Sequence, residues 1–262
     1  MIEILKKTVL LTGGLGLIGK AIACDLDKRG FHVIVVDNHN LAEELNPNID
    51  YIQFDLCKVD EYPYLIEEIK NKTHNLKCLI NNAAYNPKVE DEHSAFGRFE
   101  DIQLEGWHNE LLINLTAPVF LIKEMLPLFN QADGAQCKII NMLSTYGVVP
   151  PNQDIYKSLS KNRGKEFVKP LSYSASKAAL GMVTKYLAVY LGKKGFNVNG
   201  IVPGGIENGQ PKEFIEAYSQ LTPMGRMAKV DDLLEVANLL CGIGSDYMNG
   251  QLIAVDGGWT VW

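Results

Sequence analysis

The feature that most restricts the fold of this chain is a regular alternation between short β-branched runs and segments with helical periodicity. The first run, Lys7–Thr12, ends at glycines, and the segment that follows it, Leu17–Arg29, repeats its apolar residues at a helical period. The run Phe31–Asp37 is apolar and β-branched almost throughout, as expected of a strand buried on both faces of a parallel sheet. Further strands are expected at Tyr51–Asp55, Lys77–Asn81, Lys138–Leu143, Asn197–Val202 and Gln251–Asp256.

Repeated strand–helix units predict an α/β fold, because successive parallel strands need a helix to cross between them. Right-handed crossovers then give a single-domain, doubly wound Rossmann fold over residues 1–262, with a parallel sheet of about seven strands. A long helix is expected from Ser172 to Lys193. The least regular stretches, 85–98, 148–170 and 204–227, follow strand ends, where such folds bind their ligands.

Charge and composition exclude several classes of function. The net charge is −6 and no basic patch stands out, so no nucleic acid partner is expected. No signal peptide and no run of roughly 18 apolar residues is recognised, which predicts a protein without a membrane partner. The five cysteines form no CxxC pair and the five histidines show no ligand spacing, so we expect free thiols, a cytoplasmic protein and no metal site.

A glycine-rich loop joins the first strand to the first helix. Gly14, Gly16 and Gly19 fit the GxGxxG pattern, which allows a tight turn, close approach of a pyrophosphate and close helix packing. The following helix would direct its positive N-terminus at the phosphates. Asp37 ends the second strand 23 positions (37 − 14) after Gly14, so its carboxylate could accept the ribose hydroxyls of NAD and repel the additional phosphate of NADP. NAD is therefore expected rather than NADP, and the alternative for Asp37 is a cap of a helix or turn.

Tyr173 and Lys177 are four residues apart in the predicted helix, which places them one turn apart on the same face. A free tyrosine has a pKa of about 10, and a nearby ammonium lowers it. The pair could therefore supply a phenol that acts as acid or base near neutral pH. A solvated lysine is the alternative reading of Lys177.

An ordered set of motifs along the whole chain resembles the short-chain dehydrogenase/reductase family. They are TGGLGLIG at 12–19, Asp37, Asp55-Leu56, NNAA at 81–84, Asn114 in INLTAP, Ser144 at a strand end, YSASK at 173–177, PGG at 203–205 and VDGG at 255–258. The resemblance implies an NAD-dependent oxidoreductase that interconverts a secondary alcohol and a ketone by hydride transfer.

The resemblance also implies roles for individual residues. Tyr173 would be the general acid/base, Lys177 would bind the nicotinamide ribose and lower the pKa of Tyr173, and Ser144 would hydrogen-bond the substrate oxygen. Asn114 would hold a helix kink and a water of the proton relay. Structural alternatives are a strand-end cap for Ser144 and a helix-interior amide for Asn114. The implied cofactor-binding residues are Gly13, Gly14, Gly16, Leu17, Ile18, Gly19, Asp37, Asp55, Leu56, Asn81, Ala83, Tyr173, Lys177, Pro203, Gly204 and Ile206.

The chain departs from the family pattern in its glycine loop, in the segment before Tyr173, and after Pro203-Gly204, where the threonine often found in the family is absent. The even spacing of Gly13, Gly16 and Gly19 is similar to the extended, sugar-nucleotide branch, whereas the short length, NNAA and the terminal VDGG favour the classical branch. Ser144 and Tyr173 are 29 positions apart (173 − 144), which is longer than the classical branch usually has, so 148–170 carries an insertion beside the active site. Together with PGGIENGQP and the final VDGGW, this resembles dehydrogenases linked to bacterial surface-sugar and flagellin-glycan synthesis.

The insertion has a net charge of +3 within an acidic chain. Its basic residues are Lys157, Lys161, Arg163, Lys165 and Lys169, against Asp154 and Glu166. It is either a solvated loop or a lid that attracts an anionic substrate such as a sugar phosphate. The expected partners are thus a small-molecule substrate of sugar type and, as the family implies, a second copy of the chain in a homodimer or homotetramer. Trp259 and Trp262 would fit either a subunit interface or a buried edge.

Three other functions fit parts of the sequence. An NAD-dependent nucleotide-sugar epimerase or dehydratase would retain its cofactor and release no NADH. A non-catalytic dinucleotide sensor usually lacks the Tyr or the Lys, both of which are present here. Ser174 to Lys177 also matches the S-x-x-K motif of penicillin-recognising enzymes, but the chain has no KTG element to accompany it.

Overall fold

A seven-stranded parallel sheet forms the centre of the computed structural model, which describes residues 6–40, 45–85, 98–157, 160 and 167–262. The strand order is β3-β2-β1-β4-β5-β6-β7, and every pairing is parallel. The strands are β1 Thr8–Thr12, β2 His32–Asp37, β3 Asp50–Gln53, β4 Leu76–Asn81, β5 Cys137–Met142, β6 Phe196–Pro203 and β7 Leu252–Val255. The predicted doubly wound α/β fold with about seven strands is confirmed.

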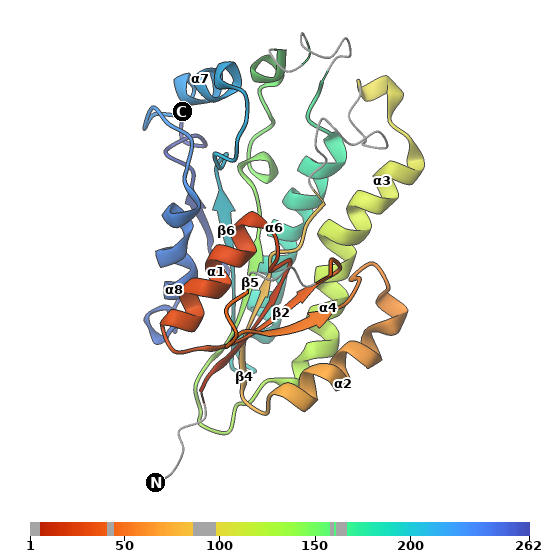
Figure 1. Ribbon diagram of the computed structural model, residues 1–262, viewed down its shortest axis with the longest axis vertical. Coiled ribbons are helices and arrows are strands. Elements are labelled where there is room, and N and C mark those ends of the chain that lie inside the picture. Colours follow the sequence, from red (N-terminus) through yellow and green to blue (C-terminus); the bar gives the residue numbers. More distant parts are fainter. Residues whose placement is uncertain (1–5, 41–44, 86–97, 158–159, 161–166) are drawn as a thin grey trace.

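Helices cover both faces of this sheet (Figure 1). One face packs against α1 Leu17–Lys28 and α8 Leu234–Cys241, and the other against α2 Tyr62–Lys72, α4 Ala117–Met125 and α6 Leu171–Gly192. The remaining helices are α3 Leu104–Leu111 and α7 Lys212–Gln220. Single turns are η1 Val59–Glu61, η2 Phe99–Asp101, η3 Leu112–Thr116, η4 Leu126–Leu128, η5 Thr145–Gly147, η6 Gln153–Tyr156, η7 Val230–Leu233 and η8 Ile243–Ser245.

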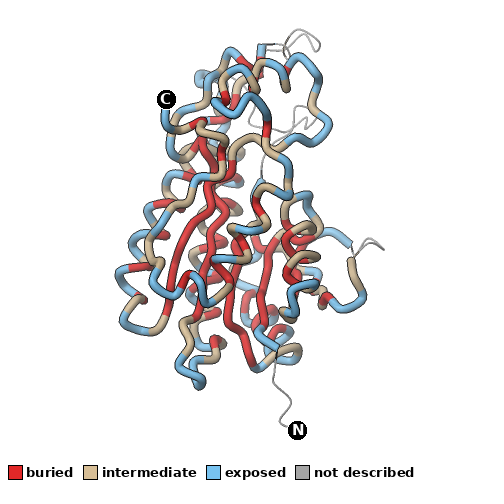
Figure 2. Tube along the Cα trace, turned by 90° about the vertical axis from the view of Figure 1, so that its left-hand side faces the viewer, coloured by how far each residue is buried: buried red, intermediate tan, exposed pale blue. Residues whose placement is uncertain are grey.

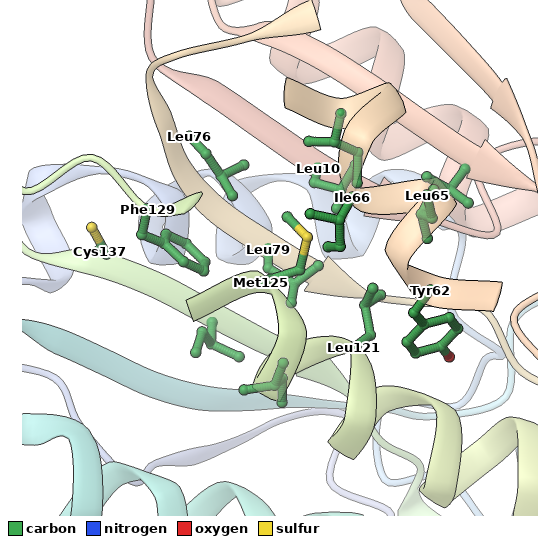
Figure 3. Close-up of a cluster of buried hydrophobic side chains, with 14 of the residues drawn as sticks. Leu10, Tyr62, Leu65, Ile66, Leu76, Leu79, Leu121, Met125, Phe129 and Cys137 are labelled. Atoms are coloured by element: carbon green, nitrogen blue, oxygen red, sulfur yellow. The ribbon is translucent and has the colours of Figure 1, made fainter. Parts of the chain in front are cut away.

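Each central strand is apolar on both sides because each side faces a separate core. In β1, Leu10 packs with α2 and α4, whereas Val9 and Leu11 pack with α1 and α8. Figure 2 shows the strands as the most continuously buried part of the chain. Figure 3 shows the first of these cores, where Leu79 and Met125 lie between the sheet and its covering helices. The continuous apolar runs in the sequence therefore reflect burial from two sides.

The helix α7 lies inside the stretch 204–227, which the sequence analysis expected to be irregular. Phe214 and Tyr218 are its buried residues, one turn apart, and the helix has only nine residues. A helix of nine residues is shorter than the window of about 11–18 residues over which a helical period is recognised, which is why it was missed. The described part of the insertion contains the helical turn η6. Residues 158–159 and 161–166 of the insertion lie outside the described residues.

One helical stretch is long and apolar enough to cross a membrane by length and composition alone. It runs from Leu104 to Leu128 with a mean hydropathy of 1.5. In the sequence, polar residues interrupt this apolar run, so no membrane segment was expected there. In the fold, Leu121, Ile122 and Met125 of this stretch pack against the sheet. The core helix of a globular protein passes the same test, so this single stretch is weak evidence for a membrane segment.

Truncating a side chain in the centre of the sheet should destabilise the protein strongly. Leu79 on β4 is 0% exposed, so Leu79→Ala removes buried methyl groups and leaves a cavity. We expect the free energy of unfolding to fall by about 2–5 kcal/mol. Denaturant unfolding followed by circular dichroism measures it. Tyr64→Ala on the exposed side of α2 is the control, with an expected change within about 0.5 kcal/mol, and equal losses for both would contradict the assignment of the core.

Candidate active site

A cleft of about 1570 Å³ opens at the carboxyl ends of the strands. It lies where β1 and β4 are neighbours, the point from which the strand order runs in opposite directions. Open α/β sheets bind ligands at such a point. Most residues proposed from the sequence line it: Gly13, Gly16, Leu17, Ile18, Gly19, Asp37, Asp55, Leu56, Ala83, Ser144, Tyr173, Lys177, Pro203, Gly204 and Ile206.

Three of the proposed residues do not line the cleft. The Cα of Gly14 faces the Val35 side chain, which a Cβ would meet at 2.4 Å. Asn81 donates from Nδ2 to Asn141 Oδ1 at 2.9 Å, inside the sheet. Asn114 is fully buried. These three residues pack or hydrogen-bond inside the protein around the cleft. Next to Asn81, the cleft is lined by Asn82, Ala83 and Ala84.

Besides Gly14, two further positions of the glycine loop have contacts that need glycine. Gly13 has φ +67° and donates its N–H to Val36 O at 2.8 Å. A Cβ on Gly19 would lie 2.1 Å from Gly13 O, so the first turn of α1 packs directly on the loop. Asn82 completes the arrangement by donating from Nδ2 to Thr12 O and to Gly13 O, each at 3.0 Å. Sequence reasoning missed Asn82, although it stands in the NNAA motif.

The N-terminus of α1 is suited to an anion. Its first turn contains no acidic residue, and the N-cap residue Gly16 offers no side-chain hydrogen bond to the free N–H groups. A Cβ on Gly16 would meet its nearest neighbour, Gly13 O, at 3.4 Å, so protein packing does not require glycine there. The free N–H groups and the positive end of the helix together favour a phosphate.

Asp37 stands at the opposite side of this loop. Its Oδ2 accepts the N–H of Leu15 at 3.0 Å, and its Oδ1 accepts the N–H of His39 at 3.2 Å. The His39 ring lies 2.9 Å from the same Oδ1 through Nδ1. Backbone donors thus hold the carboxylate at the edge of the cleft. The carboxylate also caps the turns at Leu15 and His39, which agrees with the alternative prediction that Asp37 is a cap.

Tyr173 and Lys177 begin α6 and reach the cleft together with Ser144. Lys177 is 3% exposed, donates from Nζ to Met142 O at 2.8 Å, and burial lowers its pKa to about 8. Burial raises the pKa of Tyr173, while its hydrogen bond with Ser144 acts in the opposite direction and the charge of Glu110 adds to the rise. This direction is opposite to the lowering expected from the four-residue spacing, because desolvation of the phenolate outweighs the favourable contacts.

Asn114 lies in η3, a π-helical turn between α3 and α4. Its Oδ1 accepts the N–H of Tyr85 at 2.8 Å, and its Nδ2 donates to Tyr85 O at 3.0 Å and to Ser176 Oγ at 3.3 Å. Such π turns are frequent at functional sites because they redirect a side chain out of the regular helix ladder. The amide ties the segment after β4 to α6 beside Tyr173.

Next to Tyr173 the cleft is lined by a cluster of mostly aromatic side chains, called the aromatic wall below. The sequence did not predict this cluster. Tyr156 packs against Phe167 and Phe214, with ring centroids 5.1 and 5.5 Å apart, and donates to Tyr146 Oη at 3.0 Å. The wall consists of Tyr146, Tyr156, Phe167, Phe214, Tyr218 and Met227, all of which line the cleft. The four-residue spacing of Phe214 and Tyr218 was a signal for a shared helix face, but no local pattern pairs them with Tyr156.

Part of the basic insertion is described. Lys157 is exposed and pairs with Asp154 at 2.6 Å. Lys169 is 8% exposed, so it is not available to attract an anion from solution. The other basic residues of the insertion, Lys161, Arg163 and Lys165, lie outside the described residues. No group of three or more His, Cys, Asp or Glu side chains within the described part of the chain could hold a metal ion.

Residues 7–218 match the family model of short chain dehydrogenases. A short chain dehydrogenase/reductase from Colletotrichum higginsianum is 30% identical, with 97% of this chain and 94% of that protein aligned. The 5-keto-D-gluconate 5-reductase of Escherichia coli K12 is 26% identical, with 97% and 96% aligned. The crystal structure of a short chain dehydrogenase from Leptospira borgpetersenii with bound NAD⁺ superimposes with a TM-score of 0.84 at 30% identity, covering 99% of this chain and 94% of that one.

Replacing one glycine of the loop should affect stability far more than replacing its neighbour. Gly19→Ala places a methyl group against Gly13 O, so we expect the free energy of unfolding to fall by about 1–3 kcal/mol. Gly16→Ala meets only ordinary contacts and should change it by less than about 1 kcal/mol. Thermal unfolding of the two variants without added ligand measures this, and equal melting temperatures would be inconsistent with the packing described.

Proposed function

The chain belongs to the short-chain dehydrogenase family, and we propose that it interconverts a secondary alcohol and a ketone with NAD, using Tyr173 as the general acid/base. It is an NAD(P)-dependent oxidoreductase that acts on CH–OH groups. The observation that carries the proposal is the meeting of Tyr173, Lys177 and Ser144 in one cleft with a glycine loop at a helix N-terminus. Asn114, which lies in η3 and donates to Ser176 Oγ on α6, completes the proposed catalytic set.

The cleft fits a dinucleotide along its length. The free N-terminus of α1 suits the pyrophosphate, and Asp37 stands where the adenosine ribose would lie. A carboxylate at that position favours the ribose hydroxyls of NAD over the phosphate of NADP. Asp55 and Leu56 would contact the adenine, and Ile206 the nicotinamide end. A bound nicotinamide accepts or supplies the hydride.

Side chains of the protein would transfer the proton between the substrate oxygen and Tyr173. In alcohol oxidation, the Tyr173 phenolate accepts the proton of the substrate hydroxyl, and in ketone reduction the phenol returns it. Ser144 holds the substrate oxygen beside the phenol, which limits the geometries in which the transfer can occur. Lys177 binds the nicotinamide ribose through its buried ammonium. Since burial raises the pKa of Tyr173, the phenol is protonated at neutral pH, which is the state that ketone reduction requires.

For the substrate we propose a sugar or sugar acid, including a sugar phosphate. The support is the relative named 5-keto-D-gluconate 5-reductase, together with the net charge of +2 (4 − 2) that the insertion keeps when the buried Lys169 is left out. The aromatic wall favours a second candidate, a cyclic alcohol with an apolar face, since Tyr156 and Phe214 bring ring surfaces to the cleft. A relative from Sphingobium indicum, 27% identical, is a 2,5-dichloro-2,5-cyclohexadiene-1,4-diol dehydrogenase. An epimerase or dehydratase, or a dinucleotide sensor, would show no net NADH turnover.

We also propose that the whole chain 1–262 forms one domain and assembles as a homodimer or homotetramer. The support for one domain is the pairing of β7 with β6 in the same sheet. The support for assembly is the exposed apolar side of α6, where Met182, Tyr186 and Val189 are 64%, 67% and 86% exposed. The five cysteines are free, which supports the proposed cytoplasmic location.

Removing the phenol should abolish most of the activity. With NAD and a panel of sugar acids, sugar phosphates and cyclic diols, we expect NADH formation by the parent enzyme. For Tyr173→Phe, kcat should fall by about 10²–10⁴-fold with the substrate that is turned over, because the ring remains but the proton acceptor is lost. Spectrophotometry at 340 nm measures the rates, and circular dichroism checks the fold. A variant as fast as the parent would refute the role of Tyr173.

Neutralising Asp37 should relax the choice of cofactor. Asp37→Asn keeps an acceptor for the Leu15 N–H but removes the charge that repels a 2′-phosphate. The ratio of kcat/KM for NADP to that for NAD should rise by about 10–100-fold. Asp60→Asn, an exposed change outside the cleft lining, is the matched control and should leave the ratio as it is. An unchanged ratio in Asp37→Asn would show that discrimination lies elsewhere.

A further inference from the structure

A phenol that the proposed mechanism does not use lines the cleft and has a proton to donate. Tyr146 is 8% exposed and belongs to the aromatic wall. Its Oη accepts a hydrogen bond from Tyr156 Oη at 3.0 Å. Within the described part of the chain, the proton of Tyr146 itself has no acceptor. Because buried polar groups are nearly always paired, this proton is available to water or to a bound molecule in the cleft.

The neighbouring Tyr156 fixes Tyr146 as a donor. The Tyr156 ring packs against the rings of Phe167 and Phe214, which offer no hydrogen-bond acceptor of ordinary strength. The Tyr156 proton therefore goes to Tyr146 Oη. Burial raises the pKa of Tyr146 and of Tyr156, so both phenols keep their protons at neutral pH. Since its oxygen already accepts a hydrogen bond, Tyr146 offers the cleft its O–H.

The turn that carries Tyr146 also carries the residue proposed to bind the reacting oxygen. Ser144 is the N-cap of η5, and its Oγ accepts the N–H of Tyr146 at 3.2 Å. Gly147 ends the same turn, and a Cβ there would lie 2.7 Å from the carbonyl carbon of Lys177. The turn is therefore packed directly on α6, the helix of Tyr173. Ser144 and Tyr146 are thus held in fixed positions relative to the same part of the cleft.

We propose that Tyr146 is a specificity-determining residue that donates a hydrogen bond to a second oxygen of the substrate, outside the reacting CH–OH or C=O group. Tyr156 is a positioning residue that occupies the Tyr146 oxygen and thereby directs its proton to the cleft. The inference rests on the proposed function, in which Ser144 and Tyr173 contact the reacting oxygen. It narrows the substrate to a molecule with several oxygens, such as a polyhydroxy acid or a cyclic diol.

The surroundings of Tyr146 make the second oxygen matter. A substrate without it would displace water from the hydroxyl and leave the proton unpaired, which is unfavourable in a desolvated site. The neighbouring wall residues Phe167, Phe214 and Met227 have no polar side-chain group that could replace the missing partner as efficiently as an oxygen. We therefore expect the cleft to discriminate against alcohols and ketones that carry no further oxygen.

Reduction of matched ketones with NADH tests the inference. Cyclohexanone and the three positional isomers of hydroxycyclohexanone differ by one hydroxyl, placed at increasing distance from the carbonyl. The parent enzyme should prefer at least one hydroxyketone over cyclohexanone by about 3–10-fold in kcat/KM, the effect of one hydrogen bond. Tyr146→Phe keeps the ring and should bring this ratio to about one, because only the donor is lost. Oxidation of NADH at 340 nm measures the rates.

The same ratio tests the positioning role of Tyr156. Tyr156→Phe leaves the Tyr146 hydroxyl in place but free to turn, so it should lower the preference in part. Added to Tyr146→Phe, it should lower the preference no further, because Tyr156 acts through Tyr146. A ratio of two kcat/KM values does not depend on the fraction of folded enzyme, so a merely structural effect would not move it.

Controls separate recognition from stability. Tyr64→Phe makes the same chemical change on the exposed side of α2, outside the cleft lining, and should leave the ratio at the parent value. Circular dichroism reports on the fold of each variant. Tyr146→Phe leaves the Tyr156 proton without its acceptor, so the double variant, which removes both hydroxyls, takes its place if the single variant does not fold. The comparison is repeated with the best substrate of the panel above and its single-deoxy analogues, so that it does not depend on cyclic ketones.

Two results would overturn the inference. One is a parent enzyme that shows no preference for any of the compounds with a second oxygen, and the other is a folded Tyr146→Phe enzyme whose preference equals that of the parent. If Tyr173→Phe is inactive while the preference does not respond to Tyr146→Phe, the proposed function stands and only the role of Tyr146 fails. If Tyr173→Phe is fully active, the proposed function itself fails.

Discussion

The cleft exists because β1 and β4 lie side by side in the sheet. The chain leaves these two strands toward opposite ends of the sheet, so the space beyond their carboxyl ends stays open. Hydrogen bonds close the base of that space: Thr12 Oγ1 accepts the N–H groups of Asn82 and Ala83, each at 3.0 Å. Asn82 donates back to Thr12 and Gly13. The glycine loop is thereby fixed to the neighbouring strand before any ligand contacts it.

The end of the cleft at Tyr173 contains ionisable groups that the protein interior disfavours. Lys177, Lys169 and Glu110 are each less than 9% exposed, and each has its pKa moved by burial toward neutrality. A core built only for stability would contain apolar side chains here, because uncompensated burial of charge is costly. Clusters of shifted pKa values of this kind are characteristic of sites that transfer protons.

The relatives align with almost the whole chain and carry names that point to different substrates. A keto-gluconate reductase and a chlorinated cyclohexadiene-diol dehydrogenase both align with almost the whole chain. In this chain, the segments 148–170 and 204–227 supply Tyr156, Phe167 and Phe214 to the aromatic wall. Variable segments on a common scaffold set the substrate, whereas the scaffold sets the chemistry.

The fold class, the glycine loop, Asp37 and the pairing of Tyr173 with Lys177 could all be predicted from the sequence alone. These features are local: a strand buried on both faces, a strand–turn–helix and a one-turn spacing are each written in a short stretch of residues. The direction of the Tyr173 pKa shift could not be predicted in this way, since desolvation depends on everything packed around the phenol in the folded protein. The same holds for Glu110, Lys169 and the aromatic wall. Their partners lie on separate elements, and no spacing along the chain encodes a contact that forms only when those elements pack.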